Sequence, residues 1–97
     1  MGMITLHIYL TTKPGQGAAL EDLYRRVYVP AITKQVGFRS TTLLRASGSE
    51  MRYEIDITFE TEAQRQAWAE GADHAETWPR VVALCADVSA QGFDILA

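Results

Sequence analysis

Two stretches of the chain alternate between apolar and polar residues, and this alternation constrains the fold more than any other feature of the sequence. In residues 3–12 the apolar positions are Ile4, Leu6, Ile8 and Leu10, and in residues 51–60 they are Tyr53, Ile55, Ile57 and Phe59. Successive side chains of a strand point to opposite faces of its sheet. Each stretch therefore predicts a strand with one apolar face, as in an antiparallel sheet that is covered on one side only.

The segment that follows the first of these strands changes to helical spacing. Apolar residues recur at helical intervals over residues 18–36, which predicts a helix that Pro30 kinks or restarts after Val29. Residues 38–46, rich in threonine and leucine, predict a second strand, and residues 47–49 predict a hairpin turn.

The remaining part of the chain predicts two helices and a strand. Thr61 and Gln64 have the spacing of a capping box, which marks the start of a short helix. A further helix is predicted from about His74, with an apolar stripe that includes Cys85 as a buried small side chain. Residues 91–96 predict a short last strand.

This order of elements is strand, helix, strand, strand, helix pair, strand. It predicts an α+β, ferredoxin-like βαββαβ fold in which helices cover one face of a four-stranded antiparallel sheet. At 97 residues the chain has room for one domain, spanning residues 1–97.

The composition excludes some classes of binding partner and indicates the cellular compartment. Twelve acidic and nine basic residues give a net charge of −3, so there is no basic surplus with which to bind nucleic acid. A single cysteine cannot form an internal disulfide. The first residues lack a secretory pattern, and every apolar run is far shorter than the roughly 20 residues of a membrane span. We expect a cytoplasmic protein that binds neither nucleic acid nor a membrane.

The polar face of the predicted sheet carries charges of both signs. Its members on the alternating strands are Thr5, His7, Tyr9, Thr11, Arg52, Glu54, Asp56 and Thr58, and residues 38–46 are expected to add Arg39, Leu43 and Arg45. One interpretation is a solvated face, which antiparallel sheets allow. The other is a homodimer interface formed by His7, Tyr9, Arg52, Glu54 and Asp56, which would add burial to a small core.

The chain resembles the antibiotic biosynthesis monooxygenase-like family of the dimeric α+β barrel superfamily. The resemblance is carried by the first strand running into Lys13-Pro14-Gly15, by the amphipathic helix after it, by Gly37-Phe38 and by residues 57–63 leading to the helix with Trp68. It covers nearly the whole chain. It implies a homodimer whose two sheets form a barrel, with a small-molecule pocket between sheet and helices in each subunit. Many members oxidise polycyclic aromatic compounds without metal, flavin or heme, and others degrade heme.

Aromatic residues are the candidates for the walls of such a pocket. They are Trp68, Trp78, Tyr24, Tyr28 and Phe59. Ligand pockets are mostly apolar with a few polar groups, but large aromatic residues also fill the core of a small domain, and both interpretations stay open. His74 is the candidate catalytic base because histidine titrates near neutral pH; the alternative is an exposed histidine at a helix start. Arg80 either orients an anionic ligand or is solvated.

The sequence offers neither a metal-ligand cluster nor a phosphate-binding loop. Its two histidines, His7 and His74, are far apart in the chain, and it has one cysteine. Heme-degrading members of the family use an Asn on the first strand, a Trp on the helix after the third strand and a His beyond that Trp. Trp68 matches the Trp, but Trp78 stands where the His belongs, and the first strand has no Asn. We therefore expect no metal and no other cofactor.

Two functions remain. The first is a cofactor-independent monooxygenase that acts on a small aromatic or quinone-forming compound, with His74 as base and with a tyrosine such as Tyr28 donating to the substrate oxygen. The second is a non-catalytic dimer that binds a small apolar or aromatic molecule. The polar content of the pocket distinguishes them, because a purely apolar wall supports binding alone.

Overall fold

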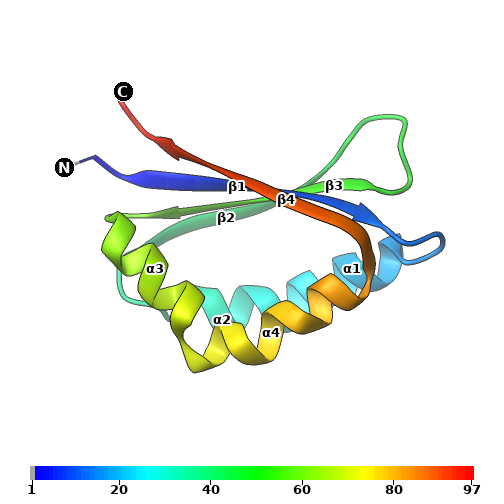
Figure 1. The fold of residues 1–97 in the computed structure, drawn as a ribbon, viewed down its shortest axis with the longest axis horizontal. Coiled ribbons are helices and arrows are strands. Elements are labelled where there is room, and N and C mark those ends of the chain that lie inside the picture. The colour runs from blue at the N-terminus through cyan, green and yellow to red at the C-terminus, as the bar shows by residue number, and fades with distance from the viewer. Residues whose placement is uncertain (1) are drawn as a thin grey trace.

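The computed structural model describes residues 2–97 and has the predicted α+β, ferredoxin-like architecture. The elements in chain order are β1 (Ile4–Thr12), α1 (Gly17–Leu23), the π-helical turn η1 (Tyr24–Tyr28), α2 (Val29–Thr33), β2 (Phe38–Arg45), β3 (Arg52–Phe59), α3 (Glu62–Glu70), α4 (Ala72–Ala83) and β4 (Cys85–Asp94). The strands form one antiparallel four-stranded sheet in the order β2-β3-β1-β4. All helices lie on one face of this sheet, and the other face has no cover (Figure 1).

The two alternating stretches form the two central strands, as predicted. β1 and β3 pair from Ile4 opposite Phe59 to Thr11 opposite Arg52. Their apolar side chains face the helices and are mostly buried together with helix residues in one core cluster. Its fully buried members include Leu20, Tyr28, Ile32, Ile55, Phe59 and Val81. The alternation therefore determines which face of the sheet carries the core.

The first helical segment is interrupted by a π-helical turn just before Pro30. The amide of Val29 donates to the carbonyl of Tyr24, five residues earlier, and α2 restarts at Val29. Proline has no amide to donate and crowds the carbonyl four residues before it, so a wider turn at this point relieves both problems. The helix ends at Thr33, before the predicted limit at residue 36.

Gly37 leads from this helix into β2 and has a φ of 82°, in the left-handed region. A Cβ atom at this position would overlap the side chain of Gln64. That side chain belongs to the capping box of α3: Gln64 Oε1 accepts from the amide of Thr61 at 3.1 Å, and Thr61 Oγ1 accepts from the amide of Gln64 at 3.2 Å. The capping box predicted from the sequence is confirmed.

The predicted polar face was wrong for part of β2. The register of β2 on β3 shifts between Phe38 and Ser40, so Arg39 is an extra residue in a bulge. Beyond the bulge every side chain changes face, which a period-2 pattern cannot anticipate. Leu43 and Arg45 therefore lie on the helix side.

The limits predicted for the last helix and the last strand were also wrong. α4 begins at Ala72 rather than near His74, and β4 starts at Cys85 rather than at residue 91. Cys85 is buried, as predicted, but as the first residue of a strand. β4 is an edge strand made mostly of small and polar residues, which have little preference for strands. It forms a strand because it pairs with β1 along its length. None of the helices in residues 2–97 combines the length and apolar character of a membrane span.

Candidate functional site

A cavity of about 100 Å³ lies between the sheet and the two C-terminal helices. The residues that line it are Leu6, Ile8, Tyr28, Ile57, Arg65, Trp68, Ala69, His74, Trp78, Val88 and Ala90. Aliphatic side chains of β1, β3 and β4 form one side, α3 and α4 supply Arg65, His74 and the two tryptophans, and η1 adds Tyr28. The cavity is thus a mostly apolar slot with a few polar groups, which is the usual character of a small-molecule site.

The break between α3 and α4 brings the aromatic groups of the slot together. α3 ends at Glu70 and α4 starts at Ala72, so Gly71 alone separates the two helices. The ring of His74, at the start of α4, meets the edge of Trp68, near the end of α3, at a centroid distance of 5.2 Å. On its other side His74 stacks on Trp78 at 5.7 Å with an interplanar angle of 19°. The histidine therefore lies between the only two tryptophans of the sequence.

His74 has the electrostatic character of a proton acceptor. Its partial burial lowers the pKa of the imidazole below the ordinary value of 6.5, and the positive charge of Arg65 lowers it further. A lowered pKa favours the neutral ring at pH 7, and a neutral imidazole can take a proton from a ligand. The geometry also explains why the ring is not free in solvent, since two indoles enclose it.

Tyr28 and Tyr24 occupy different positions relative to the slot. Tyr28 lines it, is almost fully buried, and meets Trp68 edge to face at 5.8 Å. Burial raises the pKa of Tyr28 strongly, so its hydroxyl stays protonated and can donate. Tyr24 stacks on Tyr28 at 5.6 Å but does not line the slot, and its hydroxyl bonds Thr41 Oγ1 at 3.0 Å.

Phe59 also lies away from the slot. Its ring is fully buried and meets Phe38 edge to face at 6.0 Å, in the core beneath β2 and β3. Of the five aromatic residues predicted as pocket walls, the structure brings Trp68, Trp78 and Tyr28 together with His74, and it places Tyr24 and Phe59 in the adjoining core. Arg80, on an exposed position of α4, is not among the lining residues.

Arg65 lines the slot and was missed by the sequence interpretation. It lies on α3 three residues before Trp68, so both side chains share one face of the helix. Its Nε and Nη2 atoms donate to the two carboxylate oxygens of Glu62 at 2.7 and 2.8 Å, and only 19% of its side chain is exposed. The spacing to Trp68 is the signal that could have identified it, but a charged residue early in a helix resembles an ordinary solvated position.

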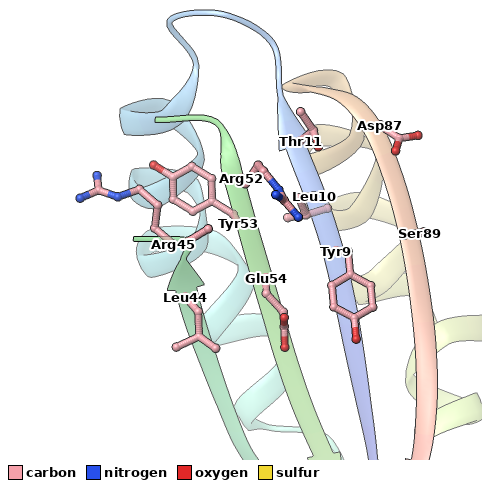
Figure 2. Close-up of a pocket in the computed structure, with 11 residues that line it drawn as sticks. Tyr9, Leu10, Thr11, Leu44, Arg45, Arg52, Tyr53, Glu54, Asp87 and Ser89 are labelled. Carbon is pink, nitrogen blue, oxygen red and sulfur yellow. The ribbon is translucent and has the colours of Figure 1, made fainter. Parts of the chain in front are cut away.

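The uncovered face of the sheet holds the residues predicted for a dimer interface. A broad hollow of about 600 Å³ lies over the ends of the strands, and Figure 2 shows Tyr9 and Glu54 side by side on neighbouring strands at its edge. Tyr9, Leu44 and Phe93 are exposed on this face by 39%, 45% and 42%. Charged residues of both signs surround them.

His7, Glu54 and Asp56 form a cluster on this face. Cross-strand pairing places His7 opposite Asp56, with Nδ1 3.4 Å from Glu54 and Nε2 4.0 Å from Asp56. The neighbouring Asp56 carboxyl, helped by partial burial, raises the pKa of Glu54. The three residues offer potential metal ligands within 4.8 Å of one another. The alternating pattern predicts all three on this face, and the register of β1 on β3 brings them together.

Comparison with known proteins points to one family. The family model for antibiotic biosynthesis monooxygenase matches residues 3–79. SnoaB, a cofactor-independent oxygenase from Streptomyces nogalater, is similar in structure with a TM-score of 0.89 at 18% identity, over 100% of this chain and 96% of that chain. A protein of unknown function from Nitrosomonas europaea gives a TM-score of 0.83 at 26% identity, over 100% of this chain and 92% of that chain. A Bordetella bronchiseptica protein provisionally classed as an antibiotic biosynthesis monooxygenase gives 0.88 at 20% identity, with 100% of both chains covered. No curated protein matches the chain at a significant level.

Proposed function

Because the chain belongs to the antibiotic biosynthesis monooxygenase family, as its first strand and its Trp68 helix predict, we propose that it oxidises a small aromatic or quinone-forming compound in the slot beside His74. Molecular oxygen is the oxidant, and the protein supplies no cofactor. The cofactor-independent activity of SnoaB, a relative of the same fold, supports this class of reaction. So does the composition of the slot, in which His74 is the only imidazole, carboxylate or thiol among the lining residues.

The observation that carries this proposal is the position of the His74 imidazole, which lines the aromatic slot and contacts both Trp68 and Trp78. This imidazole takes the proton of a phenolic or enolic hydroxyl, and the resulting anion gives one electron to oxygen. The substrate radical and superoxide then combine to a peroxide anion, which takes back the proton held by His74 and becomes a hydroperoxide. The ring carbon that bears the hydroperoxide also bears one hydrogen, and loss of water turns this carbon into a carbonyl, so one oxygen atom stays in the product and the other leaves in water. Tyr28, which remains protonated, can donate a hydrogen bond to the substrate oxygen.

The size of the slot favours a small substrate. Ligand sites commonly measure about 300–1,000 Å³, whereas this slot measures about 100 Å³. A buried apolar cavity of about 150 Å³ holds one benzene molecule, so this slot admits a single aromatic ring only when the side chains around it move outward. We infer that one aromatic ring enters the slot beside His74 and the two tryptophans, and that any further ring lies outside the slot. A small monocyclic or bicyclic compound fits better than the polycyclic substrates of many relatives.

The test is oxygen consumption with a panel of hydroquinones and anthrones, in the presence of a chelator and without added cofactor. The parent protein is expected to consume oxygen and His74→Gln to be slower by about 10²–10⁴-fold, the usual contribution of a positioned base. Glu76→Gln is the matched control, since Glu76 is an exposed neighbour on α4 that does not line the slot. Binding of the panel without oxygen uptake would support the alternative, a non-catalytic protein that holds a small aromatic molecule.

We also propose that the uncovered sheet face joins two copies of the chain in a homodimer that forms an α+β barrel. The exposed Tyr9, Leu44 and Phe93 supply apolar area, and Arg52, Glu54 and Asp56, at alternate positions of β3, give this face charges of both signs. A two-fold axis would place the basic residue of one copy against the acidic residues of the other. The family resemblance implies a homodimer whose two sheets form a barrel, and the alternation of β1 puts His7 and Tyr9 on the face that would form the interface.

A further inference from the structure

We propose that Arg65 forms an anion-binding subsite in the slot, and that the natural ligand is a hydroxyaromatic carboxylate. This inference rests on the proposed function only in taking the slot as the ligand site. Oxygen chemistry is not required for it. Three features of the slot carry it: the unused edge of the guanidinium, the absence of acid from the lining, and the position of the cation relative to His74.

The guanidinium of Arg65 is fixed but only partly used. Glu62 binds the edge formed by Nε and Nη2, with both contacts under 3 Å, and this pair holds the side chain in one orientation. Within residues 2–97, Nη1 of Arg65 makes no hydrogen bond. A guanidinium carries five N–H donors in a planar fork, so its second edge, formed by Nη1 and the other hydrogen of Nη2, can bind a carboxylate with two parallel hydrogen bonds.

The surroundings favour an anion over a neutral polar group. Among the lining residues of the described chain Arg65 is the one permanent charge, and none is acidic. The side chain is only 19% exposed, and beside it lie Trp68 and Ala69. Charges attract more strongly where water is partly excluded, so an anion reaching this edge is held better than at an open surface.

Arg65 and His74 together define where the groups of the ligand lie. Both groups line the same slot, and the positive charge of Arg65 is close enough to lower the pKa of the imidazole. A ring in the slot, in contact with the tryptophans that line it, can direct a hydroxyl to His74 and an adjacent carboxylate to Arg65. The bound carboxylate offsets the charge of Arg65, which removes one of the causes of the lowered pKa and makes His74 a stronger base when the ligand is present.

The experiment compares 2-hydroxybenzoate with 2-hydroxybenzamide by isothermal titration calorimetry on the full chain. The two probes have nearly the same size and hydroxyl position and differ in charge. We expect the carboxylate to bind the parent protein at least 10-fold more tightly than the amide. In Arg65→Gln the two affinities should become equal within about 2-fold. Arg80→Gln, which removes the same charge from an exposed position of α4, should retain the preference of the parent.

A second variant tests the shared guanidinium. Glu62→Gln removes the negative charge beside Arg65 and keeps an amide oxygen that can accept from the guanidinium, so it should tighten binding of 2-hydroxybenzoate by several fold while leaving the amide unchanged. The indole N–H resonances of Trp68 and Trp78 should shift in the ¹⁵N–¹H NMR spectrum on binding, because both residues line the slot. If Arg65→Gln does not fold, as judged by circular dichroism, Arg65→Lys replaces it, and the preference should then fall but persist.

Equal affinity of the two probes for the parent protein overturns the inference, and so does an unchanged preference in Arg65→Gln or a lost preference in Arg80→Gln. The result is separable from the oxygenase proposal. A carboxylate preference without oxygen uptake upholds the Arg65 subsite and refutes the reaction. Oxygen uptake from neutral phenols with no carboxylate preference upholds the reaction and refutes the subsite.

Discussion

Trp68 belongs both to the hydrophobic core and to the lining of the slot, and the loss of stability on its truncation to alanine can be calculated. Its side chain is 2% exposed, touches Tyr28 and His74 through ring contacts, and also lines the slot. Burial of an aromatic side chain removes about 150–250 Å² from water, which at about 25 cal/mol per Å² corresponds to about 4–6 kcal/mol. The alanine side chain that remains recovers part of this, so we expect Trp68→Ala to lose about 3–5 kcal/mol, the range of other buried tryptophan truncations.

The slot beside Trp68 could make the loss of stability in Trp68→Ala smaller than this range. A void on one side of the indole means that some of its surface has no partner atoms, and ligand-site walls of this kind contribute less than a closed core. A loss of about 1–2 kcal/mol would therefore indicate that Trp68 acts mainly as a wall of an open site. Trp78→Ala is the matched control, since Trp78 lines the same slot but is only partly buried. Its loss should be clearly smaller.

Equilibrium denaturation in urea measures these losses. Parent and variants should be compared at one protein concentration, because dimer formation would make the midpoint concentration-dependent. The slope against urea must stay unchanged for the midpoints to be read as free energies. A loss below about 0.5 kcal/mol for Trp68→Ala would contradict both the core and the pocket role, and equal losses for the two tryptophans would refute the burial difference on which the calculation rests.

Three further perturbations test other parts of the structure. Gly37→Ala should destabilise the protein more than Gly48→Ala in the same denaturation assay, because both glycines have a φ near +80° but only a Cβ at position 37 meets a side chain. The positive φ alone costs about 1–2 kcal/mol in either variant. Equal losses would show that the side chain of Gln64 moves aside freely. Because the pKa of His74 is lowered in the folded protein, this residue contributes free energy of unfolding that is fully present above the ordinary histidine pKa and is lost as the pH falls through the lowered pKa. The difference in free energy of unfolding between pH 7 and pH 5 should therefore be smaller in His74→Gln than in the parent protein. An unchanged difference would refute the pKa shift. Glu54→Lys should move the mass measured by light scattering from two chains toward the 10.8 kDa of one, whereas Glu76→Lys on the helix side should not, and a single-chain mass for the parent protein would refute the dimer.

Much of the fold could be predicted because its central strands carry a pattern that depends on local geometry alone. The alternation of β1 and β3 identifies both faces of the sheet, and the spacing of Thr61 and Gln64 identifies the start of α3. The predictions were wrong where pairing with another strand determines the structure of a segment. The bulge at Arg39 reverses the faces of β2, and β4 is a strand because β1 lies beside it. Neither the bulge nor the pairing of β4 can be recognised from the amino-acid types of the residues concerned.

The candidate site was predictable only in its aromatic part. Aromatic residues near a helix pair suggest a pocket, and Trp68, Trp78 and Tyr28 do meet at one slot with His74. Which aromatics stand at the slot and which stand behind it depends on packing, as Tyr24 and Phe59 show. Arg65 was not predicted because its role depends on the face that α3 turns toward the sheet. The sequence predicted His7, Glu54 and Asp56 on one face, but their close contacts depend on the register of β1 on β3.

The alternation that builds the sheet also makes its two faces separable by experiment. Leu6, Ile8 and Ile57 form the floor of the slot, and their immediate neighbours His7 and Asp56 point to the uncovered face. A change such as Glu54→Lys therefore alters the proposed interface without removing any group that lines the slot. If the core alone holds β1 and β3 in place, the affinity of that variant for 2-hydroxybenzoate should equal that of the parent even when the dimer is lost. A loss of affinity in parallel with the loss of the dimer would instead mean that the second copy keeps these strands in position, and the slot would then depend on the dimer although none of its described lining residues faces the interface.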